Sequence, residues 1–172
     1  MKRVALCLFL AGCAGPSSTY RVYVDSDFSQ GERNVIQASL NDWTTKSNGL
    51  VTFQVDVVKT WGTQVPKHTI KVISSTQAVV SEACFEDAAG CTVKTKDESV
   101  ADSSRIYLPM DRQFGGFFSS VVRHEIGHSL GLKHDESDPL MKKHIDDSSA
   151  RVTCRDVNVL DALHGAPYSC SE

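Results

Sequence analysis

The sequence lacks the features that define several large classes of protein. It has no run of the roughly 18 consecutive apolar residues that a membrane-spanning helix needs. Only 5 prolines and 11 glycines occur among 172 residues, which excludes a collagen-like or low-complexity chain. The 18 Lys and Arg residues nearly balance the 21 Asp and Glu residues, so nucleic acid is not an expected partner. With 41% hydrophobic residues, the chain is expected to fold as a globular domain.

The first residues have the layout of a secretory signal peptide. Lys2 and Arg3 form a short basic start, residues 4–10 are all apolar, and small residues follow them. Such a segment directs export and is removed from the mature protein. Residues 1–12 are therefore expected to take no part in the fold.

Residues 10–13 make the export signal more specific. Their sequence, Leu-Ala-Gly-Cys, resembles the lipobox of bacterial lipoproteins, in which cleavage occurs before the cysteine and a lipid is attached to its sulfur. The resemblance implies a lipid anchor on Cys13, a tether at 13–19 and one domain at 20–172, held on a membrane of a bacterial cell envelope. Ordinary signal-peptide cleavage near Ala14 is the alternative.

Four cysteines lie beyond this segment: Cys84, Cys91, Cys154 and Cys170. An even number of cysteines in an exported protein predicts disulfides, here two. The pairs Cys84–Cys91 and Cys154–Cys170 are favoured because each closes a short loop, although the sequence leaves the other two pairings open. Zinc binding by these cysteines is disfavoured because no CxxC spacing occurs among them.

The rest of the chain mixes the two hydrophobic periodicities of strands and helices. Ser29 and Glu32, and again Thr153 and Asp156, have the spacing of a capping box at a helix start. The pattern is weak over 75–102, with a disulfide-bridged loop expected around Cys84–Cys91. We predict strands at 20–24, 50–58, 69–74 and 104–108, and helices at 29–46, 117–130 and 153–163.

The helix at 117–130 and the turn after it carry the residues that predict a function. His124 and His128 are four residues apart, so both imidazoles lie on one helix face and can bind one cation. Glu125 is turned by about 100° from His124, so it lies beside the metal, close enough to hold a water. Gly131 permits a left-handed conformation that ends the helix, and the chain can then bring His134 back as a third ligand. Three imidazoles with an open fourth position are typical of catalytic zinc.

These residues form the pattern HExxHxxGxxH, which resembles the signature of the metzincin zinc peptidases, with the matrixins as the most similar branch. The resemblance implies an α+β zincin domain with a twisted mixed β-sheet, an active-site helix and a C-terminal helix. Metzincins also place a methionine in a tight turn beneath the zinc ligands, and Met141 is similar in position to that residue. Asp135, directly after the third histidine, is a residue found in other metzincin branches.

The resemblance further implies a zinc-dependent endopeptidase that acts on a protein or peptide substrate. With Zn²⁺ on His124, His128 and His134, Glu125 would take a proton from a zinc-bound water and deliver it to the leaving amine. An extended peptide would pair with an edge strand supplied by 75–102, and residues 142–152 would form a pocket wall.

Two other functions remain open at this point. One is a non-catalytic zinc-binding envelope lipoprotein, against which Glu125 argues because a structural zinc site needs no general base. The other is an amidohydrolase directed at peptidoglycan, and the spacing of Gly131 and His134 favours a protein substrate over it by resemblance only. In every case we expect a monomer.

Overall fold

The computed structural model describes residues 17–59, 66–94, 103–111, 115–145, 147–166 and 170. The predicted signal peptide, the lipidation site Cys13 and the start of the tether lie outside these residues, so the export signal stays a prediction. In chain order the elements are β1 (Ser18–Asp25), α1 (Gln30–Lys46), β2 (Val51–Val58), β3 (Thr69–Ser75), α2 (Gln77–Ala83), β4 (Cys91–Lys94), β5 (Ser103–Pro109), the 3₁₀ turn η2 (Gly115–Phe117), α3 (Phe118–Leu130) and α4 (Cys154–Leu163).

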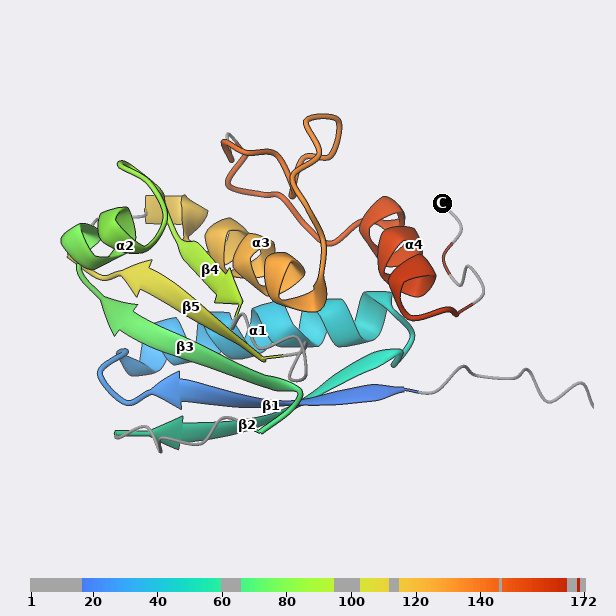
Figure 1. The fold of residues 1–172 in the computed structure, drawn as a ribbon, viewed down its shortest axis with the longest axis horizontal. Helices are drawn as coiled ribbons and strands as arrows, with labels where there is room; N and C mark the ends of the chain where they lie inside the picture. The colour runs from blue at the N-terminus through green and yellow to red at the C-terminus, as the bar shows by residue number, and fades with distance from the viewer. Residues whose placement is uncertain are drawn as a thin grey trace, which may run out of the picture.

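The described strands form one mixed sheet in the order β2-β1-β3-β5-β4 (Figure 1). Strands β2, β1, β3 and β5 run parallel to one another, and Val22 of β1 lies opposite Val55 of β2 and Ile70 of β3. The short strand β4 runs antiparallel to β5, its Thr92 facing Ile106. This arrangement confirms the predicted α+β class and the mixed sheet.

Helices α1 and α3 pack on the same face of this sheet. That face carries Val22, Ile70 and Ile106, whose side chains share one hydrophobic core with buried residues of both helices. Trp43 of α1 is fully buried in this core, and its indole Nε1 donates a hydrogen bond to the carbonyl oxygen of Arg123 on α3 at 3.1 Å. The indole thus fixes α1 against the helix that carries the histidines.

The predicted helix starts are confirmed at both capping boxes. The hydroxyl of Ser29 accepts from the N–H of Glu32, and the Glu32 carboxylate accepts from the N–H of Ser29. Thr153 and Asp156 form the same reciprocal pair at the start of α4. These bonds satisfy N–H groups that the first turn of a helix leaves without partners.

The disulfide-bridged loop expected around Cys84–Cys91 is present, and two short elements that the weak pattern of this region did not predict flank it. The chain forms α2 over Gln77–Ala83 and β4 over Cys91–Lys94. Both elements are too short for periodicity to reveal, since α2 has 7 residues and β4 has 4. The helix expected at 117–130 also begins later, at Phe118, after the 3₁₀ turn.

The structure contains both favoured disulfides. Cys84–Cys91 joins the end of α2 to the start of β4, and Cys154–Cys170 joins the start of α4 to the C-terminal segment.

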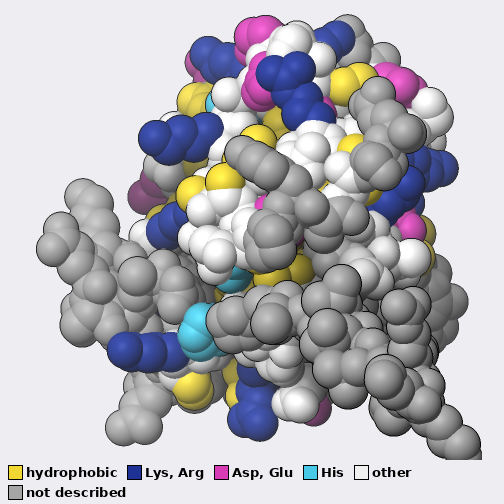
Figure 2. Space-filling view, turned by 90° about the vertical axis from the view of Figure 1, so that its right-hand side faces the viewer, with side chains coloured by type: hydrophobic (Ala, Val, Ile, Leu, Met, Phe, Trp, Pro, Cys, Tyr) yellow, Lys and Arg dark blue, Asp and Glu magenta, His cyan; other side chains and the backbone are white. Residues whose placement is uncertain are grey.

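On the face in Figure 2, the basic side chains are dispersed among acidic and hydrophobic ones. Within the described part of the chain, each helix is too short or too polar to cross a bilayer.

Candidate metal centre

Helix α3 ends at Leu130, and Gly131 turns the chain directly after it. Gly131 has φ 112°, a left-handed conformation that favours glycine, and its N–H bonds back to the carbonyl groups of Gly127 and His128. The next N–H, from Leu132, also returns to Gly127, at 3.0 Å. The chain therefore reverses within a few residues, and His134 lies beside the helix it has just left.

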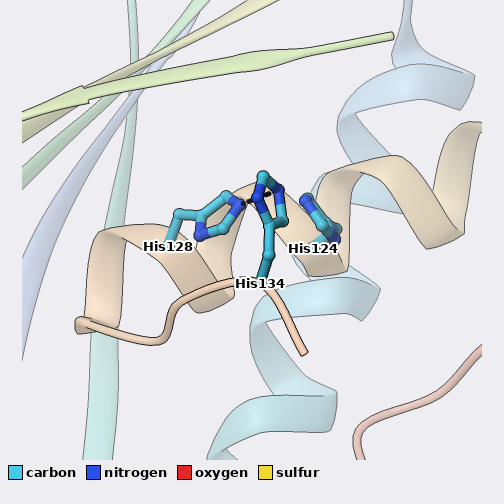
Figure 3. Close-up of side chains that lie close together, drawn as sticks. All are labelled: His124, His128 and His134. Atoms are coloured by element: carbon cyan, nitrogen blue, oxygen red, sulfur yellow. Dashed lines mark hydrogen bonds between the residues drawn. The ribbon is translucent and has the colours of Figure 1, made fainter. Parts of the chain in front are cut away.

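The three histidines of the motif converge. His124 and His128 project from the same side of α3, and His134 approaches from the segment after it (Figure 3). One ring nitrogen from each lies within 4.8 Å of the other two, and the Nε2 atoms of His128 and His134 are 3.2 Å apart. Nitrogen atoms so close together can bind one cation.

Backbone carbonyl groups orient two of these rings. The Nδ1 atom of His124 is 2.7 Å from the carbonyl oxygen of Leu140, and that of His128 is 2.9 Å from the carbonyl oxygen of Leu132. A carbonyl oxygen can only accept, so each Nδ1 carries the proton and each Nε2 keeps its lone pair. This second bond is typical of metal-binding histidine, because it sets both tautomer and ring orientation.

The surroundings of the rings also favour the neutral form that binds metal. Burial, aided by the nearby His128, lowers the pKa of His124 to about 4. Burial is likewise the main cause that lowers the pKa of His128 and of His134. Three neutral imidazole nitrogens on convergent rings suit Zn²⁺, and the donor set therefore fits that metal.

Glu125 lies directly beside this cluster and is buried, with 5% of its surface exposed. Burial raises the pKa of its carboxyl to about 7, and a hydrogen bond from Thr92 opposes that shift. A cleft of about 950 Å³ opens over the site, lined by Glu125, the three histidines and two further segments, 84–94 and 143–145. We call 84–94 the rim segment. A carboxyl with a pKa near neutrality in a cleft is suited to general base catalysis.

Met141 lies against α3 and is 1% exposed. A side-chain carbon added to Gly127 would lie 2.8 Å from the Met141 sulfur and 3.1 Å from Trp43 Cζ2. A larger residue at position 127 would therefore have to displace Met141. We call α3 together with residues 131–141 the ligand segment.

Asp138 is a residue of this turn that the sequence reasoning missed. Its Oδ1 accepts from the N–H groups of Leu140 at 2.7 Å and Met141 at 2.9 Å. Because Leu140 supplies the carbonyl that orients His124, Asp138 supports a ligand through the backbone. An aspartate just before a proline is typical of a turn, and that signal could have identified it.

Thr92 and Gly90 of the rim segment were missed as well. The Thr92 hydroxyl bonds to the Glu125 carboxylate at 2.6 Å, and the backbone of Gly90 packs against the same side chain. No local pattern marks either residue, since the hydrogen bond links positions 33 apart in the sequence.

Comparison with known proteins identifies the family. The matrixin family model (peptidase M10) matches residues 17–165. The structure is similar to that of high choriolytic enzyme 1, a hatching-enzyme zinc protease from the medaka fish Oryzias latipes. The TM-score is 0.53 at 12% identity, with 95% of this chain and 100% of that one covered. Myroilysin is also similar, with a TM-score of 0.45, 20% identity and coverage of 74% and 54%.

A search of curated protein sequences finds no significant match. The likeness to the hatching enzyme, at 12% identity, supports the metzincin-like fold. The family assignment therefore rests on the matched sequence model, which spans all the described strands and helices and the three histidines. On this evidence the chain belongs to the matrixin family.

Proposed function

We propose that the protein is a zinc-dependent endopeptidase in which Glu125 is the general base. One observation carries the proposal: three neutral imidazoles converge at the floor of a cleft, and a buried carboxyl lies next to them. A structural zinc site would need neither the cleft nor the carboxyl.

The residues have distinct roles in this reaction. His124, His128 and His134 would hold Zn²⁺, which polarises a carbonyl group and lowers the pKa of a bound water when present. The Glu125 carboxylate accepts a proton from the attacking water and then donates it to the nitrogen of the leaving amine. Burial raises the pKa of this carboxyl in the metal-free protein, and a more basic carboxylate accepts the proton more readily.

The cleft offers a place for an extended peptide. Within the described residues β4 is the last strand of the sheet, with β5 on one side, and β4 also lines the cleft. A peptide can add to such an edge through backbone hydrogen bonds. Phe117, Val121 and Ile145 are apolar residues of the cleft and would contact a substrate side chain.

We also propose that the protein is exported and anchored to a bacterial membrane through Cys13. The two disulfides support export, because disulfides persist in oxidising compartments. Growth of cells that express the full chain with a labelled fatty acid tests the anchor. Label on the wild type and none on Cys13→Ala is expected, whereas a soluble, unlabelled wild type would contradict the proposal.

Metal content and peptide cleavage, measured side by side, test the enzymatic proposal. Purified wild type should bind one zinc per chain and cleave casein or a peptide library, and a chelator should abolish cleavage. Glu125→Gln should keep zinc but lose cleavage, while the control Glu82→Gln, on the exposed side of α2, should behave as wild type. Zinc binding without hydrolysis would instead indicate a binding lipoprotein. Release of amines from peptidoglycan alone would indicate an amidohydrolase.

A further inference from the structure

We propose that Thr92, on the edge strand β4, is a positioning residue that holds one oxygen of the Glu125 carboxylate and leaves the other to move the proton. The inference rests on the proposed endopeptidase function, because it assigns a role within that reaction. It concerns a contact between the rim segment and the ligand segment, which no spacing in the sequence indicates.

The contact is short and lies at the side of the cleft. The Thr92 hydroxyl donates to Oε2 of Glu125 at 2.6 Å and lies 3.0 Å from the carbonyl oxygen of the same residue. Among the described residues, this hydroxyl is the group that donates to the Glu125 carboxylate. A hydrogen bond to a charged acceptor is stronger than one between neutral groups, so it restrains the rotation of the carboxylate.

Gly90 confines the same carboxyl from another direction. A methyl group at Gly90 would lie 2.9 Å from both Cγ and Oε1 of Glu125, closer than real contacts allow. Glu125 thus lies against the backbone of residue 90 with no room for a side chain there. Oε2 is bonded to Thr92 and Oε1 lies beside Gly90, so the two oxygens are not equivalent.

A disulfide and strand pairing tie these two residues to the rest of the fold. Cys91 lies between them, is 1% exposed and is bound to Cys84 by the disulfide. Thr92 itself pairs with Ile106 of β5 in the sheet. A hydroxyl fixed on a strand and next to a disulfide positions a partner more precisely than one on a mobile loop.

In catalysis the two oxygens of the Glu125 carboxylate would then have different roles. With Oε2 held by the hydroxyl, Oε1 is the atom that accepts the proton from water and later gives it to the leaving amine. Without the hydroxyl the carboxylate can rotate about its terminal torsion, which has a broad and shallow energy profile. Fewer orientations would then be productive, which lowers turnover and leaves substrate binding unchanged.

Kinetics of three hydroxyl variants test this role in the zinc-loaded enzyme. Thr92→Val keeps the shape of the side chain without the hydroxyl and should lower kcat by about 10- to 100-fold, the range expected for one hydrogen bond to a charged group. KM and zinc content should stay within about twofold of wild type, since neither involves the hydroxyl in this proposal. Thr92→Ser keeps the hydroxyl and should restore most of kcat. Thr92→Ala serves as a second hydroxyl-free variant.

A loss of kcat that is equal in Thr92→Ser and Thr92→Val would overturn the inference, and so would wild-type kcat in Thr92→Val. If wild type cleaves peptides and Thr92→Val is unchanged, the inference fails and the proposed function stands. If zinc-loaded wild type cleaves nothing, the proposed function fails instead.

A measurement without metal tests the contact itself. Urea unfolding of the metal-free protein is compared for wild type, Thr92→Val, Glu125→Ala and the double variant at pH 8. Loss of the hydroxyl should lower the folding constant by about tenfold when Glu125 is present and by much less when it is replaced by alanine. Equal effects in both backgrounds would show that Thr92 does not act on Glu125.

Discussion

The two sides of the cleft differ in how they are built and in what they hold. The ligand segment is one continuous stretch of chain that carries all three histidines, Gly131 and Met141. The rim segment is a disulfide loop and a four-residue strand, and it contacts Glu125 from the side. The convergence of the histidines thus depends on local spacing, whereas the Glu125 carboxyl is held by a contact between distant parts of the chain.

The largest effect is expected from a ligand. Loss of a residue that hydrogen-bonds a metal ligand lowers metal affinity by roughly 10- to 100-fold. His134→Ala removes a proposed ligand itself, so its zinc affinity should fall by more than this, and peptide hydrolysis should fall to background. His144→Ala is the control for metal content, because His144 is exposed and lies outside the three-histidine group. Atomic absorption measures the zinc content of both variants, His134→Ala and His144→Ala. Full zinc content in His134→Ala would contradict its role as a ligand.

The matching change in the rim segment is Gly90→Ala. The added methyl displaces the Glu125 carboxyl, and a misplacement of about 1 Å can lower turnover by roughly 100-fold. Zinc content should stay at the wild-type value, in contrast to the ligand variant. Gly31→Ala is the control, since a carbon there meets only the Ser29 hydroxyl oxygen at 3.9 Å. Loss of zinc from Gly90→Ala would show that the rim segment also affects metal binding, which would contradict the difference between the rim segment and the ligand segment.

A smaller effect is expected beneath the ligands. Asp138→Ala leaves the N–H groups of Leu140 and Met141 without their acceptor, which should lower the free energy of unfolding by about 3 kcal/mol. Zinc affinity should fall by about tenfold, because the carbonyl of Leu140 orients His124. Turnover per bound zinc should change little.

Chemical denaturation and zinc titration measure the two effects of Asp138→Ala. The control Asp138→Asn keeps an oxygen that can accept both bonds. Losses as large in Asp138→Asn as in Asp138→Ala would argue against this account of the turn.

The smallest effect concerns pH. Burial, with the nearby Asp138 carboxylate, raises the pKa of Asp156 from 3.8 to about 6. A carboxyl with a raised folded-state pKa stabilises the fold at pH values below the unfolded-state pKa, and this contribution is lost as pH rises through the folded-state value. Stability should therefore fall by about 2 kcal/mol between pH 4 and roughly pH 7. Asp156→Asn, followed by urea unfolding across this range, should remove that part of the pH dependence.

Much of the fold follows from periodicity, and the reason is physical. Helix α1 and strands β1, β3 and β5 each bury alternate or helically spaced residues in one core, so their patterns are strong. Helix α2 and strand β4 are short and carry fewer buried residues, and their positions depend on the disulfide and on pairing with β5. Such constraints are tertiary and leave little trace in the local sequence.

The candidate site divides in the same way. His124, His128 and His134 could be predicted because a helix and a glycine turn determine where ligands at those intervals lie. Thr92 could not be predicted, since only the folded sheet brings it to Glu125. Asp138 has a turn signal but becomes informative only once Leu140 is seen to orient His124.

The contact of Gly127 with Met141 and Trp43 limits how cleavage preference could be re-engineered. These atoms fill the space beneath the three histidines so closely that a side chain at Gly127 would have to displace Met141 or Trp43 from the ligand helix. Mutant libraries that seek a new preference should therefore leave this trio unchanged. Diversity is better placed at Phe117 and Ile145, which line the cleft and take no part in this contact.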